Sequence, residues 1–253
     1  MNISTDTDFF GTIDDHRWAA QFTVLSYTGG GQTLIPHGFF RDWLGNEPDF
    51  GQFTIGRCSG IGIGSQAKYD STAQHLQIGR YVSGGANLRF ILNGQHDMRT
   101  ISTYLLALGG MGLKNSPIPQ YADIVIKNDV WIGDEAMILG GAVIENGCVI
   151  GARTLVPPNF RSEPYGVYAG SPARLLRFRF SAQVRAALLA LAWWELPLSW
   201  IRENNAHFLQ DMAADDGDAL RIIAELAESK RRHLEAACGA DTGARHQQKG
   251  DHA

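Results

Sequence analysis

Residues 126–156 read IKNDVWIGDEAMILGGAVIENGCVIGARTLV, and a period of six residues runs through them. Every sixth position carries a β-branched aliphatic side chain. The members of this series are Ile126, Ile132, Ile138, Ile144, Ile150 and Val156. An α-helix repeats at about 3.6 residues and a half-buried strand at about two, so neither accounts for the spacing. A short strand followed by a corner does account for it, with the aliphatic side chain pointing inward in each repeat.

A second series of smaller residues follows the first at a distance of four positions. Its members are Val130, Ala136, Ala142, Cys148 and Thr154. Between the two series lie turn-forming pairs such as Asn128-Asp129 and Gly140-Gly141. Three strands and three corners close one triangular coil, so the pattern predicts a parallel β-helix.

The same step reappears upstream, with breaks. The positions that carry it are Ile55, Ile61, Ile78, Gly84, Phe90 and His96. Residues 73–77 interrupt the register and predict an irregular corner. After His96 the period fails until Ile126, which predicts a loop excursion over residues 97–123. Loops of that length in compact domains are usually functional or disordered, and the apolar run TYLLALGGMG argues against disorder.

The chain divides into four predicted parts, with an all-β core and a helical appendage. Residues 1–50 form an N-terminal cap with little repeat character, and residues 51–178 form the β-helix that carries the excursion. Residues 179–238 show helical periodicity and predict C-terminal α-helices, for which Ser181 and Asp218 are plausible N-caps. Residues 239–253 are polar, and we expect a disordered tail there.

Composition excludes several classes of partner. The net charge of −4 argues against nucleic-acid binding, which needs a concentrated basic face. No stretch has the 18 or so consecutive apolar residues of a membrane span, and the acidic N-terminus MNISTDTDFFGTIDD does not resemble a signal peptide. The three cysteines, Cys58, Cys148 and Cys238, are far apart and form no CxxC pair. We therefore expect a cytoplasmic protein without disulfides.

Four segments carry a resemblance to a known family: FILNGQHDMRTISTY, IKNDVWIGDEAMILGGAVI, GVYAGSPARLLRFRF and WWELP. They resemble the xenobiotic acetyltransferases, the hexapeptide-repeat acyltransferases that include streptogramin and chloramphenicol acetyltransferases. The likeness runs from about Ile78 to about Phe208. It implies a left-handed parallel β-helix, a homotrimer, acetyl-CoA as acyl donor and an active site between neighbouring subunits.

His96 is the candidate catalytic residue. Acetyl transfer to a hydroxyl needs a base that takes the proton as the oxygen attacks the thioester, and imidazole suits this task near neutral pH. His96 stands where the excursion begins, and it matches the family's motif through NGQH and ISTY. The alternative is a loop histidine that only forms local hydrogen bonds.

Four further residues are candidates for substrate binding: Asn93, Ser102, Tyr104 and Trp131. Trp131 occupies an outward position of its repeat, and the family places the matching tryptophan beside the histidine of the adjacent subunit. Packing against a neighbouring chain is the alternative for Trp131. Ser102 and Tyr104 follow His96 and either contact the acceptor and the oxyanion or serve the turn. Asn93 is a further candidate, although it fits the shaping of the corner better.

Five residues are candidates for coenzyme A binding along the outside of the helix: Gly141, Ala142, Arg153, Arg174 and Arg177. Exposed backbone at Gly141 and Ala142 suits the pantetheine amides. The phosphates require basic side chains, which the three arginines offer.

The sequence and the resemblance together predict an acetyl-CoA-dependent O-acetyltransferase. It moves an acetyl group directly to a hydroxyl of a small molecule such as an antibiotic, a sugar or a related metabolite, and needs no metal. One alternative is a non-catalytic β-helix used for assembly. A second is a γ-type carbonic anhydrase, which requires three histidines around zinc, whereas only His96 lies in the repeat region proper and His75 in an irregular corner.

Overall fold

The structure is a computed structural model that describes residues 1–110, 112–115 and 120–247, with side chains described through residue 237. The chain forms two compact units, Met1–Phe178 and Arg179–Ala253. The first unit holds the repeats, and the second holds the helices.

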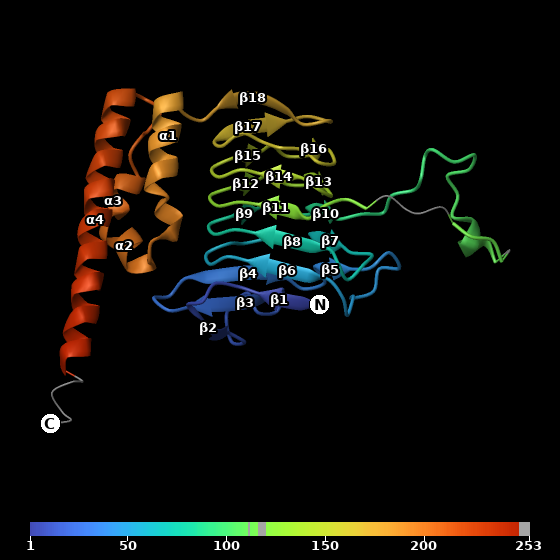
Figure 1. Ribbon diagram of the computed structural model, residues 1–253, viewed down its shortest axis with the longest axis horizontal. Coiled ribbons are helices and arrows are strands. Elements are labelled where there is room, and N and C mark those ends of the chain that lie inside the picture. Colours follow the sequence, from blue (N-terminus) through green and yellow to red (C-terminus); the bar gives the residue numbers. More distant parts are fainter. Residues whose placement is uncertain (111, 116–119, 248–253) are drawn as a thin grey trace. The chain divides into compact units, whose positions relative to one another are not determined.

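The first unit is a β-helix with three sheets, called faces A, B and C below (Figure 1). Face A has the strand order β1 (Asn2–Ser4), β6 (Gln52–Ile55), β8 (His75–Ile78), β11 (Ile124–Ile126) and β14 (Val143–Ile144). Face B has the order β18 (Arg174–Phe178), β17 (Gly166–Ala169), β15 (Val149–Ile150), β12 (Trp131–Ile132) and β9 (Ser83–Gly84). Face C has the order β16 (Leu155–Val156), β13 (Met137–Leu139), β10 (Arg89–Ile91), β7 (Gln66–Lys68) and β5 (Phe40–Arg41). Neighbouring strands are parallel except β17 and β18, which are antiparallel.

The strand register confirms the six-residue period and the three repeats per coil. Residues of the aliphatic series pair with partners 18 positions later, one coil further along the helix. The pairs are Ile126 with Ile144, Ile132 with Ile150, and Ile138 with Val156. All six side chains are buried, so the series forms three columns that fill the interior. Their burial is the main source of stability in these coils.

The corners use residues that tolerate a left-handed backbone. Asp129 and Asn159 have φ values of 55° and 56°, and both are residue types that adopt this conformation at small cost. Gly141 turns its corner at φ 80°, and a Cβ there would overlap the side chain of Asn159. The turn-forming pairs seen in the sequence therefore mark corners, as predicted.

The N-terminal segment contributes more to the β-helix than the sequence indicated. Strand β1 extends face A, and β5 extends face C, so two strands of residues 1–50 belong to the faces. Only β2 (Phe9–Thr12), β3 (Phe22–Tyr27) and β4 (Gln32–Pro36) form a separate antiparallel sheet. The prediction of a cap with little repeat character missed β1 and β5 because strands of two or three residues are too short to display a period.

One edge of the β-helix, between faces C and A, carries three irregular connections. These are residues 42–51 between β5 and β6, residues 69–74 between β7 and β8, and residues 92–123 between β10 and β11. We call this edge the loop edge. The described part of the longest connection projects away from the coils (Figure 1) and includes a short 3-10 helix, η1 (Leu106–Gly109). The excursion starts at residue 92, five positions earlier than predicted, because β10 ends at Ile91.

The second unit consists of α1 (Ala182–Leu191), η2 (Trp193–Glu195), α2 (Leu198–Glu203), α3 (Asn205–Phe208) and α4 (Asp216–Gln247). Ser181 caps α1 as predicted, since its hydroxyl accepts a hydrogen bond from the amide of Val184 at 3.3 Å. Asp218 does not cap α4, because the helix begins two residues earlier and the Asp215 carboxylate accepts the Asp218 amide at 2.9 Å.

The expected disordered tail differs from the structure over residues 239–247, which continue α4 as helix. Extending an existing helix fixes one residue for each new hydrogen bond, so a polar sequence can continue a helix that it would not start. Residues 248–253 lie outside the described residues. None of the helices in the described part of the chain combines the length and the hydropathy needed to cross a membrane.

Candidate active site

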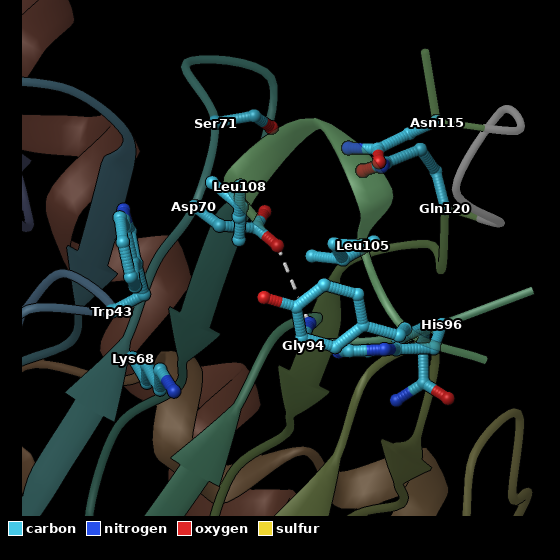
Figure 2. A pocket seen from close by; sticks show the side chains of 12 residues that line it. Trp43, Lys68, Asp70, Ser71, Gly94, His96, Leu105, Leu108, Asn115 and Gln120 are labelled. Atoms are coloured by element: carbon cyan, nitrogen blue, oxygen red, sulfur yellow. Dashed lines mark hydrogen bonds between the residues drawn. The ribbon is translucent and has the colours of Figure 1, made fainter. Parts of the chain in front are cut away.

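The three connections of the loop edge surround a pocket of about 560 Å³. Trp43 comes from the first connection, Asp70 and Ser71 from the second, and Lys68 from the end of β7. The excursion supplies the remaining wall. Its lining residues are Gly94, Gln95, His96, Tyr104, Leu105, Leu108, Asn115 and Gln120. Figure 2 shows Trp43 and Lys68 across the pocket from His96.

The position of the pocket follows from the construction of the β-helix. A connection at a corner leaves the ladders of the three faces intact, so it tolerates insertions that a strand does not. Successive coils stack, and insertions at the same corner of neighbouring coils therefore lie beside one another. The loop edge joins residues 43, 70 and 96, which are far apart in the sequence.

The His96 ring is exposed to solvent, and its orientation is set by the excursion itself. Its Nδ1 lies 2.5 Å from the carbonyl oxygen of Thr103. A carbonyl oxygen only accepts, so Nδ1 carries the proton and donates it. In the neutral ring, Nε2 then holds the free lone pair. The contact selects the tautomer that a general base at Nε2 requires.

A hydrogen-bonded turn between His96 and Thr103 stabilises the contact of Nδ1 with the Thr103 carbonyl. The buried Asp97 carboxylate accepts the Arg99 amide at 3.0 Å and the Arg99 Nε at 2.8 Å. The Thr100 hydroxyl bonds to the carbonyl oxygens of Asp97 and Ser102. The turn between His96 and Thr103 is thus closed by side chains, which keeps the carbonyl acceptor near the ring.

The four predicted acceptor residues lie in four different places. Tyr104 lines the pocket together with His96. Ser102 accepts the backbone amide of Tyr104 at 3.1 Å, which is turn chemistry. Asn93 is buried beneath the corner and bonds to Asp70 and Gln120. Trp131 lies on β12 of face B, and 58% of its surface is exposed. Because the loop edge lies between faces C and A, Trp131 does not reach it within one chain.

The predicted coenzyme A residues do not come together within one chain. Gly141 and Ala142 lie on the loop edge, one coil beyond the excursion, although the Ala142 side chain is buried. Arg153 lies between faces B and C and forms an ion pair with Glu135 at 2.7 Å. Arg174 and Arg177 lie on β18 of face B. The backbone candidates and the arginine candidates therefore occupy different sides of the β-helix.

Sequence reasoning missed Trp43, Lys68 and Asp70 as pocket residues. The signal for Asp70 was the interrupted register at residues 73–77, which marked an irregular corner without showing what it contained. Trp43 had no such signal, because the sequence around it shows no six-residue repeat. Arg161 was missed as well, and its guanidinium bonds to the carbonyl of Gly141 on the loop edge.

Metal-binding clusters and thiols are two other classes of reactive group that bear on the described part of the chain. Within it, no group of three or more His, Cys, Asp or Glu side chains has the arrangement of a metal site. Cys58 and Cys148 are free thiols. Cys148 is a small side chain packed in the core, and this burial raises the pKa of its thiol.

The model for the bacterial transferase hexapeptide (six repeats) matches residues 123–158. A probable macrolide acetyltransferase from Lysinibacillus sphaericus is 33% identical over 155 residues, which cover 59% of this chain and 83% of the relative. A chloramphenicol acetyltransferase from Escherichia coli is 38% identical over 134 residues, which cover 51% of this chain and 63% of the relative.

Among solved structures, a hexapeptide-repeat containing acetyltransferase from Vibrio cholerae O1 biovar eltor, complexed with acetyl coenzyme A, matches 55% of this chain and 64% of its own. The sequence identity is 21% and the TM-score is 0.37. The chain spans less than two thirds of the length of the Escherichia coli relative.

Proposed function

The chain belongs to the hexapeptide-repeat acetyltransferase family, and on that premise we propose that it is an acetyl-CoA-dependent O-acetyltransferase with His96 as the general base. One observation supports the role of His96 above the others. Its Nδ1 donates to the Thr103 carbonyl in a pocket of substrate size, and this leaves Nε2 as the proton acceptor.

The reaction follows from this geometry in two steps. Nε2 of His96 takes the proton of the acceptor hydroxyl as the oxygen attacks the thioester carbonyl carbon, and a tetrahedral oxyanion forms. The oxyanion then collapses, the C–S bond breaks, and the imidazolium returns its proton to the departing thiolate. The Thr103 carbonyl stabilises the positive ring between the two steps because its hydrogen bond to Nδ1–H strengthens as the ring becomes charged.

The pocket suits an acceptor that has both an apolar face and polar groups. Trp43, Leu105 and Leu108 supply apolar surface, whereas Lys68, Asn115 and Gln120 supply polar groups. A volume of about 560 Å³ lies in the range of small-molecule sites. The relatives are named for chloramphenicol and macrolides, and we take these hydroxyl-bearing antibiotics as the first acceptors to test.

We further propose a left-handed β-helix that assembles as a homotrimer. Trp131 and the arginines of face B lie away from the loop edge within one chain, so a neighbouring copy is needed to bring them to the pocket. The excursion also exposes Met98, Ile101 and Leu108, apolar side chains that a second copy would cover. Light scattering should give three times the mass of one chain, and a single-chain mass would contradict the proposal.

The proposed reaction is tested by the release of free thiol from acetyl coenzyme A. Chloramphenicol, a macrolide and a set of sugars serve as acceptors, with product masses read in parallel. We expect thiol release that depends on one acceptor and a product heavier by one acetyl group. Absence of any acetylated product across the panel would favour a non-catalytic assembly protein. The free cysteines fit a cytoplasmic enzyme, where acetyl coenzyme A is available.

A further inference from the structure

We propose that Asp70 is a positioning residue for His96, through the corner formed by Asn93 and Gly94. This inference rests on the proposed function, because it assumes that His96 is the base. Asp70 lies in the connection 69–74, one coil before the excursion, and its carboxylate reaches the root of the excursion from there.

Both carboxylate oxygens of Asp70 are occupied. Oδ2 accepts the Asn93 side-chain amide at 2.9 Å and the Gly94 backbone amide at 3.3 Å, the second of which is drawn in Figure 2. Oδ1 accepts the Gln74 side-chain amide at 2.5 Å. In return, the Gln74 carbonyl accepts the backbone amides of Asp70 and Ser71 at 2.8 and 3.4 Å. The Asp70 carboxylate is thus held by residues of its own connection, 69–74, and points toward the connection 92–123.

Asn93 receives this contact in a buried position, with 3% of its surface exposed. Its side-chain amide nitrogen also donates to Gln120 at 3.3 Å. Rotation of the amide would place its oxygen against the oxygens of Asp70 and Gln120, so only one orientation is favourable. In that orientation the Asn93 carbonyl oxygen is buried without a hydrogen bond among the described residues.

The corner matters because His96 follows it by two residues and belongs to no strand. Gly94 has a φ of 95°, a left-handed conformation that gives the chain its direction away from β10. The ring of His96 is fixed at its Nδ1 by Thr103, and its backbone is fixed at the corner by Asp70. Without the contact between Asp70 and the corner, the ring keeps its tautomer, but its distance from the reacting atoms is no longer fixed. A displacement of about 1 Å can cost about a hundredfold in rate.

The role requires a carboxylate rather than an amide at position 70. Asp70→Asn retains the size of the side chain but replaces one acceptor oxygen with a donor group. That group must face either Gln74 Nε2 or the two donors of the corner, and both arrangements oppose donor to donor. Rotating Gln74 to match would abandon its bonds to the amides of Asp70 and Ser71. The substitution therefore removes the anchor with little change in volume.

Steady-state kinetics of Asp70→Asn with acetyl coenzyme A and chloramphenicol provide the first test. We expect kcat to fall by about tenfold to a hundredfold, with the KM for acetyl coenzyme A changed by less than about twofold. Asp49→Asn is the matched control, since Asp49 is exposed in the neighbouring connection and the substitution makes the same change of charge. A lower kcat in both variants, or a raised acceptor KM with kcat unchanged in Asp70→Asn, would overturn the proposal.

A double-mutant cycle with Asn93→Ala tests whether Asp70 acts through the corner. If it does, Asp70→Asn should lower kcat by a smaller factor in the Asn93→Ala background than in the wild type, because only the Gly94 amide is then left at the corner for the carboxylate to hold. Fully additive losses would show that Asp70 acts by another route and would overturn the proposal.

Hydrogen–deuterium exchange keeps the inference testable even where the proposed function fails. In Asp70→Asn, the peptide covering residues 92–97 should exchange faster, while strands β13 and β14 exchange as in the wild type. Unchanged exchange over 92–97 would overturn the role of Asp70, whatever the acceptor. Absence of transfer by the wild type to every acceptor would instead remove the proposed function and leave the anchor to be judged by exchange alone.

Discussion

The coils from Ile124 to Val156 and the loop edge are built by opposite rules. In the coils, each repeat has the same length, and each side chain of the six-step series is aliphatic, buried and paired with an equivalent one in the next coil. At the loop edge, the connections differ in length, and their side chains form polar contacts between coils. Asp70 reaches Asn93 across 23 residues of sequence, and His96 is held by a carbonyl of its own excursion.

This difference teaches how the molecule separates stability from chemistry. The aliphatic columns contribute through burial, whose free energy depends on the apolar area removed from water and is insensitive to direction. The loop edge contributes through hydrogen bonds, which depend on direction and place single atoms. A substitution in the columns should therefore change unfolding, and a substitution at the loop edge should change turnover.

The largest effect is expected for His96→Ala. The turnover should fall by about 10² to 10⁴-fold, because a positioned base contributes on that scale. The melting temperature should stay within about one degree of the wild type, since the ring is exposed and lies outside the aliphatic columns. Thiol release at saturating acetyl coenzyme A and a thermal melt measure the two quantities.

His37→Ala is the matched control for His96→Ala, because His37 is an exposed histidine of the N-terminal segment outside the pocket. It should acetylate at the wild-type rate. If His96→Ala also acetylates at that rate, then His96 is not the base. The expectation that substitutions at the loop edge change turnover would then be wrong for this residue.

Ile138→Ala tests the other region. Ile138 is 1% exposed and pairs with Phe90 and Val156 on face C, so the substitution leaves a cavity in the column. The free energy of unfolding should fall by about 2–5 kcal/mol, measured by denaturant titration. The KM and kcat of the molecules that remain folded should be those of the wild type.

The neighbouring residue provides the control within the same strand. Met137 points outward with 38% of its surface exposed, and Met137→Ala should cost less than about 1 kcal/mol. Equal losses at positions 137 and 138 would show that the inward columns are not the main source of stability.

Acetyl coenzyme A should stabilise the fold by binding the native state. At a free concentration a hundredfold above its Kd, the gain is about 2.7 kcal/mol, visible as a higher melting temperature. Hydrogen exchange should locate the protection at the loop edge, around residues 92–97 and 140–142, and not inside the columns. The donor assignment is wrong if neither a thermal shift nor heat on titration is found.

The smallest effect is expected for Trp43→Ala. The indole is 59% exposed in the free protein and lines the pocket opposite His96, so its loss removes apolar contact with the acceptor (Figure 2). The acceptor KM should rise about tenfold, equal to about 1.4 kcal/mol, with kcat little changed. Leu44→Ala changes an exposed neighbour outside the pocket and should leave the acceptor KM unaltered.

The predictable part of the fold was the part that repeats. The six-residue step at Ile126, Ile132 and Ile138 predicted the coils, because each of these residues is placed by the same local rule. The register between strands confirmed a coil of 18 residues. Strands β1 and β5 escaped notice because they are short and unrepeated. Ser181 was identified as a cap from its own neighbours, whereas the cap of α4 lies three residues before the predicted Asp218, because several aspartates compete there.

The candidate site was predictable only in its centre. His96 and Tyr104 lie close in sequence, and a motif records them together. Trp43, Lys68 and Asp70 come from earlier coils, so no spacing in the sequence relates them to His96. Ser102 was expected either at the acceptor or in the turn, and Asn93 was a candidate that fitted the corner better. Their hydrogen bonds are those of the turn and of the corner.

By itself, the sequence determined the period, the inward aliphatic columns, the interrupted corner and the excursion that begins beside His96. These are local properties, because the choice between inward and outward positions depends only on residues a few places away. Tertiary structure alone decided which loops meet at the pocket and which atoms hold Asn93 and His96. That outcome depends on the stacking of coils, which brings residues 43, 70 and 96 to one edge, and on hydrogen-bond directions that no spacing encodes.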